Sequence, residues 1–408
     1  MIIFSLEDYS GEAVSVPENW YKAFDMLKAY LRTVVSEKKV VFIDEMPWLD
    51  TAGSDFVSAL ESFWNGWAAA EDNIVLVACG SATSWMTDKL LGDKGGLFNR
   101  SATRIFLRPF NLKETEEYLK SRGFELTRYD IAECYMIMGG IPFYLKQMNP
   151  RWTLARNIDM MFFKEKGLLW DEFDHLYGTL FKNADTYIAV VEALSRKRMG
   201  MTRKEIVKET GISDNGDFGK VLKNLVDNEF IRPYNYFGNK KRDTIYQLAD
   251  FYTMFYFSYI KDNYGRDENF WANSTDLPLR RSWAGYTFEQ LCLHHLEQIR
   301  RSIGIFGVQC ETSAWFSKGA EGKRGAQIDL LIDRRDRIIN ICEMKYSINE
   351  FTIDSEYDKS LRNKIQVFRD ETRTRKALHL TMITTYGLKR NMYSNSVQSQ
   401  VVLDDLFI

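Results

Sequence analysis

With 408 residues and 45% hydrophobic content, the chain can bury two or three separate cores, and its net charge of −2 argues against a general polyanion binder. The five cysteines are odd in number, far apart and mostly within apolar runs, which argues against a disulfide or zinc framework. No apolar stretch is long enough to span a bilayer and no signal peptide is recognisable, so we expect a cytoplasmic protein without membrane contacts.

The first chemically informative element is an apolar run at residues 40–43, which Asp44 and Glu45 follow. Four apolar residues without alternation predict a central parallel strand covered on both faces, and α/β sheets bind ligands at the carboxyl ends of such strands. The pattern is that of the Walker B motif of P-loop ATPases, in which Asp44 would help to hold Mg²⁺ and Glu45 would orient the attacking water. The alternative is an acidic pair that only caps the next helix.

Two further strands are expected in the first part of the chain, at residues 74–79 and 104–110. Arg100 precedes the second of them and could act on a phosphate bound by a neighbouring subunit, because an arginine there stabilises the spreading negative charge. A solvated surface position is the alternative for this arginine. A helical region then leads to the turn at 139–142, where two glycines and Pro142 would break a helix.

A P-loop ATPase also needs the string GxxxxGK[ST], because bare backbone N–H groups and a lysine wrap the phosphates. No such string occurs in the sequence. We therefore expect these 408 residues to bind ATP poorly, despite Asp44 and Glu45.

Four segments, taken in this order and spacing, resemble the prokaryotic AAA-type ATPases related to the archaeal ATPase family: VVFIDEMPWLD, VACGSATSWM, GLFNRSATRIFLRPF and GGIPFYL. The resemblance covers almost the whole chain and implies ATP and Mg²⁺ as cofactors, Ser81 as the sensor of the γ-phosphate, and Pro142 near the nucleotide. Members of that family normally begin with a P-loop ahead of the point where this chain starts. The chain is accordingly identified as a family member that lacks the Walker A segment.

Residues 183–260 predict a winged helix-turn-helix, with three helices and then two strands that flank a basic tip. Thr202 and Glu205 have the spacing of a capping box at the start of the second helix. Five basic residues on the third helix and the tip are candidates for contacts with the phosphates of double-stranded DNA: Lys220, Lys223, Lys240, Lys241 and Arg242. Docking of a protein partner is the alternative, since winged helices serve both purposes.

The last segment holds a second chemical constellation. Glu343 and Lys345 are two residues apart on an expected strand, so they point to the same face, and Asp329 lies on the neighbouring strand. Two carboxylates that meet repel each other unless a divalent cation neutralises them, and Mg²⁺ or Mn²⁺ beside a lysine suits phosphodiester hydrolysis. The pattern resembles the PD-(D/E)XK nuclease core, which implies Glu289, Asp329 and Glu343 as metal ligands. A surface ion pair on a hairpin is the alternative.

These elements predict an α/β protein with the following parts: a truncated P-loop NTPase sheet at 1–112, a helical lid at 113–182, the winged helix at 183–260, a connector at 261–284 and an α/β restriction-nuclease-like domain at 285–408. Two functions stay open. The first is an ATPase-family protein, as a homo-oligomer, that acts on DNA and includes a Mg²⁺-dependent endonuclease. The second is a non-catalytic regulatory or interaction protein that uses the ATPase core as a scaffold.

Overall fold

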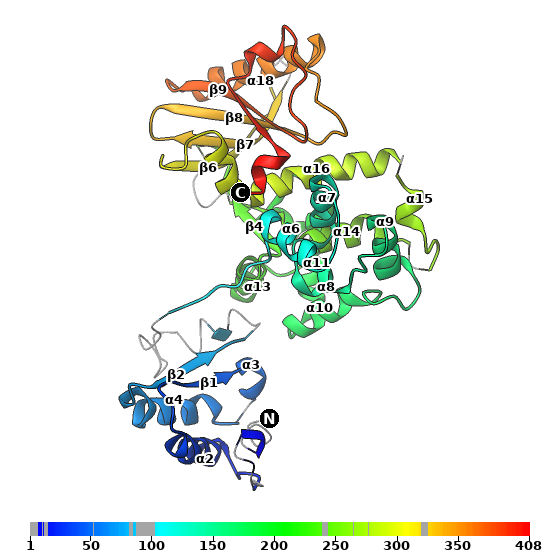
Figure 1. The fold of residues 1–408 in the computed structure, drawn as a ribbon. Coiled ribbons are helices and arrows are strands. Elements are labelled where there is room, and N and C mark those ends of the chain that lie inside the picture. Colours follow the sequence, from blue (N-terminus) through cyan, green and yellow to red (C-terminus); the bar gives the residue numbers. More distant parts are fainter. Residues whose placement is uncertain are drawn as a thin grey trace. The chain divides into compact units, whose positions relative to one another are not determined.

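The computed structural model describes residues 7–9, 11, 15–51, 53–80, 85–86, 103–238, 244–263, 265–275, 277–319 and 325–408. The chain divides into two compact units, Met1–Leu107 and Arg108–Ile408 (Figure 1). Both units mix helices with strands. Among the described residues, no helix combines the length and the apolar character that crossing a membrane requires.

The first unit contains a two-stranded parallel sheet with helices packed against it. Its elements are α2 (Trp20–Thr33), β1 (Lys39–Ile43), α3 (Met46–Leu49), α4 (Phe56–Gly66), η1 (Ala68–Ala70) and β2 (Ile74–Ala78). β1 pairs with β2 in parallel, with Val41 opposite Leu76. The core of the unit forms where Phe24 of α2 and Phe56 and Leu60 of α4 meet Val41 of β1.

Two expectations for this unit are wrong. Val41 and Ile43 are buried against α2 and α4, but Val40 is 65% and Phe42 60% exposed, so β1 is covered on one face only (Figure 1). The physical reason is that α2 and α4 pack on the same face of the sheet. Residues 104–110 form no strand, because no described strand lies beside them to accept the ladder hydrogen bonds.

The second unit begins with a helical layer. Its helices before residue 183 are α6 (Leu112–Ser121), α7 (Arg128–Met138), α8 (Pro142–Gln147), α9 (Leu154–Ile158), η3 (Asp159–Phe163) and α10 (Glu172–Leu180). Asn111 with Glu114 and Thr127 with Asp130 form capping boxes that start α6 and α7. Every residue of α7 from Cys134 to Met138 is buried, so this helix lies in the centre of the unit.

A helix–hairpin segment, residues 184–248, follows. It consists of α11 (Ala184–Arg196), β3 (Met201–Thr202), α12 (Arg203–Thr210), α13 (Gly216–Asp227), β4 (Ile231–Tyr234) and β5 (Ile245–Leu248). The three strands form an antiparallel sheet in the order β3-β5-β4. The capping box predicted from Thr202 and Glu205 is confirmed at the start of α12, and Gly211 ends that helix in a left-handed conformation.

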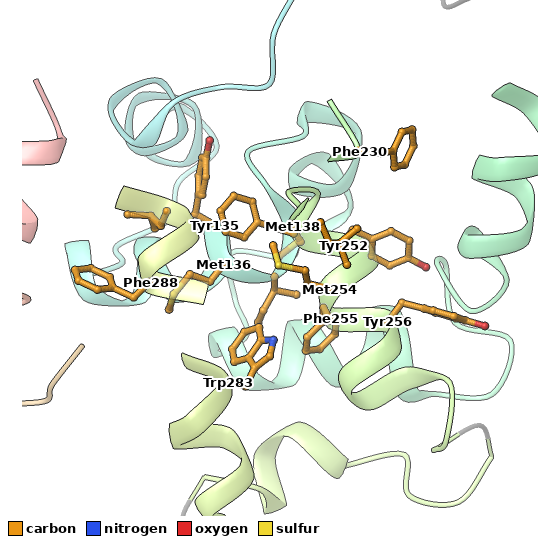
Figure 2. Close-up of a cluster of buried hydrophobic side chains, with 14 of the residues drawn as sticks. Tyr135, Met136, Met138, Phe230, Tyr252, Met254, Phe255, Tyr256, Trp283 and Phe288 are labelled. Atoms are coloured by element: carbon orange, nitrogen blue, oxygen red, sulfur yellow. The ribbon is translucent and has the colours of Figure 1, made fainter. Parts of the chain in front are cut away.

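The aromatic stretch after β5 packs into the same core as α7. Its helices are α14 (Phe251–Phe255), η5 (Tyr256–Ile260), α15 (Phe270–Asn273), α16 (Pro278–His294) and α17 (Leu296–Ser302). Figure 2 shows Met138 of α7 beside Met254, with Phe255 of α14 and Trp283 of α16 below them and Met136 towards Phe288. This shared core joins α7, α14 and α16 into one body.

The chain ends in a five-stranded sheet with a helix on each face (Figure 1). Its elements are β6 (Cys310–Ser317), β7 (Ala326–Arg334), β8 (Ile338–Lys345), α18 (Ser355–Thr372), β9 (Ala377–Thr384), η6 (Ser394–Ser396), β10 (Ser399–Val402) and η7 (Leu403–Leu406). The order is β10-β9-β8-β7-β6, with β6, β7 and β8 antiparallel and β8, β9 and β10 parallel. Cys342 of β8 packs in the core that contains α16, and Ile341 packs against Phe368 of α18.

His295 connects two helices of this unit and predicts a pH effect. Its Nε2 accepts a hydrogen bond from the Leu112 backbone N–H at 3.1 Å, and its Nδ1 donates to the Leu291 carbonyl at 2.8 Å. Burial lowers the pKa of His295 from 6.5 to about 4, because a proton on Nε2 would be desolvated and would break the first bond. The stability that this neutral ring contributes is present above pH 6.5 and is lost as the pH falls towards 4.

We therefore expect His295→Gln to weaken the dependence of unfolding free energy on pH by up to about 3 kcal/mol between neutral and acidic pH. Urea titrations of both proteins at a series of pH values measure it. The same substitution at the exposed His175 is the control and should leave the wild-type profile unchanged. Parallel profiles for His295→Gln and the wild type would contradict the assignment.

Candidate functional site

The acid–lysine cluster comprises the following residues of the second unit: Glu289, Asp329, Glu343, Lys345 and Lys364. They come from four elements, because α16 carries Glu289, β7 carries Asp329, β8 ends at Lys345 and α18 carries Lys364. β7 and β8 are antiparallel neighbours, and the two helices pack on the faces of the sheet. The fold thus collects residues that are far apart in the sequence.

Glu343 is the best-anchored member of the cluster and is only 7% exposed. Its Oε2 lies 2.6 Å from Lys364 Nζ, and its Oε1 lies 3.3 Å from Lys345 Nζ and accepts a 2.8 Å hydrogen bond from the Tyr357 hydroxyl. Burial alone would raise the pKa of Glu343, but the positive charges of Lys364 and Lys345 outweigh burial and hold that pKa below its usual value. Glu343 is therefore ionised, and Lys345 shares its face of β8 as the two-residue spacing predicts.

The other two acids are in a different electrostatic state. Burial raises the pKa of Asp329, although a hydrogen bond from Gln327 Nε2 at 2.5 Å opposes this. Burial, and after it the charge of Asp329, raises the pKa of Glu289 to about 8. No described residue forms a hydrogen bond with the Glu289 carboxyl. Carboxyls with pKa values driven apart in this way are typical of acid–base sites.

The donor set suits a hard divalent cation, because Mg²⁺ and Mn²⁺ take oxygen ligands. Among the described residues, however, no three carboxylate, imidazole or thiol side chains are close enough to one another to hold a metal ion. A cation at Glu343 would compete with Lys364 and Lys345 for the same oxygens. The metal-ligand roles of Glu289, Asp329 and Glu343 stay predictions.

A cavity of about 590 Å³ opens beside the cluster, between the β4–β5 hairpin, α16 and the β6–β7 pair. Glu289 and Asp329 line one part of it, and Arg198 and Arg232 also line it. Its volume lies in the range of pockets that bind small ligands. Of the acid–lysine cluster, Glu289 and Asp329 are thus accessible to a small ligand in this cavity.

The basic residues expected to contact DNA are only partly within the described structure. Lys220 forms an ion pair with Asp217 at 2.9 Å, and Lys223 forms one with Asp227 at 3.6 Å, both on α13. These acids reduce the positive potential of the outward face of the helix. The remaining candidates, Lys240, Lys241 and Arg242, lie outside the described residues. DNA contact through this segment stays a prediction.

The expected nucleotide site lies at the carboxyl end of β1 in the first unit. Asp44 accepts hydrogen bonds from the Cys79 thiol, which follows β2, and from the Glu45 backbone N–H at 3.0 Å. Glu45 precedes α3 in a left-handed conformation, with φ 48°, and its side chain makes no capping hydrogen bond. The side chain of Glu45 therefore does not cap α3, as the alternative interpretation had it.

The described structure does not bring the other residues predicted around the nucleotide together with Asp44 and Glu45. Ser81 and Arg100 lie outside the described residues. Pro142 starts α8 in the second unit, two residues after Gly140, and both Gly139 and Gly140 have positive φ. The roles of these three residues, and of Asp44 in binding Mg²⁺, stay predictions.

Sequence reasoning missed Lys364 and Tyr357, which are seven residues apart on α18 and both contact Glu343. A spacing of seven places two residues on the same face of a helix, so the sequence holds a signal. That signal becomes specific only when the face is known to pack on β8. Arg198 and Arg232 of the cavity were likewise not predicted as site residues.

Comparisons with known proteins give distant similarities. No family model matches the chain. The chain is 24% identical to the uncharacterized protein MJECL04 of Methanocaldococcus jannaschii over 334 residues. This matched region spans 81% of this chain and 70% of the relative. The chain is similar to the Walker-type ATPase PABY2304 of Pyrococcus abyssi, with 13% identity, 62% and 74% of the two chains covered and a TM-score of 0.40. It is also similar to the crystal structure of protein VC1899 from Vibrio cholerae, with 12% identity and a TM-score of 0.23. That match covers 100% of this chain and 85% of the other chain.

Proposed function

We propose that the second unit hydrolyses phosphodiester bonds in DNA with the help of a divalent cation. The observation that carries this proposal is that two acids of the acid–lysine cluster differ in their ionisation. Glu343 is ionised between two lysines, while the pKa of the adjacent Glu289 is raised to about 8. Such a combination of separated acidities and cationic side chains beside a cavity is typical of sites that stabilise charge in a reaction.

The residues divide the work as follows. Asp329 and Glu343, with Glu289, would hold the cation only after their side chains move closer together than in this structure, and the bound cation would supply charge neutralisation and an activated water. Lys345 lies beside these acids and stabilises the negative charge that develops on the phosphoryl oxygens. Lys364 and Tyr357 keep Glu343 ionised and oriented. The roles given to Glu289, Asp329, Glu343 and Lys345 are those that the resemblance to the PD-(D/E)XK core implies.

The remaining parts of the proposal follow from architecture. The order of helices and strands in the helix–hairpin segment, with an antiparallel sheet of three short strands, supports a winged helix-turn-helix that holds double-stranded DNA. In the first unit, carboxylates directly after a parallel strand support a relation to the P-loop ATPases. ATP binding there should be weak, because a phosphate-cradling loop motif does not occur in the sequence.

A second candidate is a non-catalytic regulatory protein, with the winged helix docking a partner. One observation favours it, namely that Lys364 and Lys345 already neutralise Glu343 without a cation. In that case the cluster is a structural ion-pair network in the fold of a nuclease.

Cleavage of duplex DNA by the full chain in Mn²⁺ decides between the two candidates. We expect Lys345→Ala to reduce the cleavage rate by on the order of 10²–10³-fold, because it removes one stabilising charge. The rise in melting temperature on adding Mn²⁺ should survive in this variant and disappear in Asp329→Ala. Lys359→Ala, an exposed lysine on α18, is the matched control and should cleave like the wild type. A wild-type chain with neither cleavage nor a melting shift in Mn²⁺ would establish the non-catalytic role.

A further inference from the structure

Arg232 lies at the wall of the cavity, and none of the described acidic residues pairs with it. It extends from β4, and its guanidinium donates to the side-chain carbonyl of Gln290 and, at 3.5 Å, to that of Gln247. No described carboxylate forms an ion pair with it. Burial lowers the pKa of Arg232 to about 10, because desolvation disfavours its charged form. A half-buried cation that has only neutral partners favours an anion as the missing one.

A second arginine faces the same cavity. Arg198 donates from Nη1 to the Ser282 carbonyl at 3.3 Å and to the Ser282 hydroxyl at 3.1 Å, and it lies over the Tyr286 ring at 5.1 Å. Among the described residues no carboxylate forms an ion pair with it either. Gln247 connects the two arginines, since its Nε2 donates to the Arg198 carbonyl at 2.8 Å. One part of the cavity wall therefore carries two positive charges that hydrogen bonds hold in place.

The rest of the lining adds aromatic and acidic groups. Tyr234, Tyr286 and Trp315 line the cavity, and Glu289 and Asp329 of the acid–lysine cluster reach it too. The tyrosine hydroxyl of Tyr234 donates to the Met199 carbonyl, which fixes its ring. A ligand that fits this lining has an anionic group for the arginines and a flat ring for the aromatic side chains. At about 590 Å³ the cavity takes one small ligand of this kind.

We propose that this cavity binds one nucleotide through its phosphate. Arg232 and Arg198 bind the phosphate oxygens, because guanidinium groups match phosphate in a bidentate manner, and the aromatic side chains lie beside the base. The nucleotide is either free or the phosphorylated end of a DNA strand. The strand end rests on the proposed function, since it would place the adjacent phosphodiester near Glu289 and Asp329. The pocket would then direct the nuclease site to strand ends.

Calorimetric titration of the full chain without divalent cations tests the pocket separately from catalysis. We expect deoxyadenosine monophosphate, as the 5′ or the 3′ isomer, to bind, and deoxyadenosine to bind at least about tenfold more weakly. Arg232→Gln and Arg198→Gln should each weaken binding of the monophosphate by about tenfold or more. Arg301→Gln, a surface arginine paired with Glu297, is the control and should bind like the wild type.

Competition by a 5′-phosphorylated oligonucleotide identifies the source of the nucleotide. Displacement of the monophosphate supports a strand end, and failure to displace it supports a free nucleotide. The melting temperature of Arg232→Gln should equal or exceed that of the wild type, because an unpaired charge is removed. If Arg232→Gln does not fold, binding of the monophosphate by Arg198→Gln tests the pocket. Equal binding of nucleoside and nucleotide, no binding of either, or unchanged binding in the folded arginine variants would overturn the pocket. Binding without cleavage would overturn only the nuclease proposal.

Discussion

Glu343→Ala is expected to lower the free energy of unfolding of the second unit by about 3–5 kcal/mol. The substitution leaves Lys364 and Lys345 without the carboxylate that now lies 2.6 Å and 3.3 Å from their Nζ atoms. It also leaves the Tyr357 hydroxyl without its acceptor. Lys364 and Lys345 are 19% and 33% exposed, so leaving both without a carboxylate costs more than loss of a fully exposed ion pair. Urea unfolding followed by circular dichroism measures the change.

The design of this experiment separates charge from packing. Glu350→Ala, at an exposed position after β8, is the matched control and should change stability by less than about 0.5 kcal/mol. Adding Lys364→Met to Glu343→Ala should recover part of the loss, because Lys364 is the less exposed of the two lysines, at 19% against 33%. A loss below about 1 kcal/mol for Glu343→Ala would show that water already compensates the lysines.

Phe255→Ala is expected to destabilise the second unit by about 3–5 kcal/mol, as large-to-small changes of buried aromatic residues do. Phe255 is fully buried and lies within ring-to-ring distance of Phe162, Trp271 and Trp283, at 5.6, 5.1 and 5.8 Å between centroids. Figure 2 shows it near Met254 and Trp283 in the core that α7, α14 and α16 share. Removing the ring leaves a cavity, and several helices would have to move at the same time to fill it.

Phe143 offers the matched control, since it is the same residue type but 53% exposed. Phe143→Ala should change the midpoint of urea unfolding only slightly. We also expect a single transition for the second unit in Phe255→Ala, because the helical layer and the α16 helix share this core. Separate transitions of the helical layer and the five-stranded sheet would show that the core does not couple them.

Local patterns in the sequence were sufficient for several parts of the structure. Asp44 and Glu45 follow a strand because an apolar run precedes them, and Thr202 caps α12 because Glu205 stands three residues later. The shared face of Glu343 and Lys345 follows from the alternation of side chains along β8. Each of these features depends on neighbours within a few residues, which is why the sequence alone was enough.

Other features were decided only by the tertiary structure. The exposure of Val40 and Phe42 depends on which face of the sheet the helices cover, and the missing strand at 104–110 depends on a pairing partner. The ionised state of Glu343 depends on Lys364, which follows it by 21 residues and reaches it only because α18 packs on β8. The pKa values of Glu289 and Arg232 depend on burial between segments far apart in the chain. Spacing in a sequence fixes the direction of a side chain, whereas its charge and its partners are set by groups that only folding brings near.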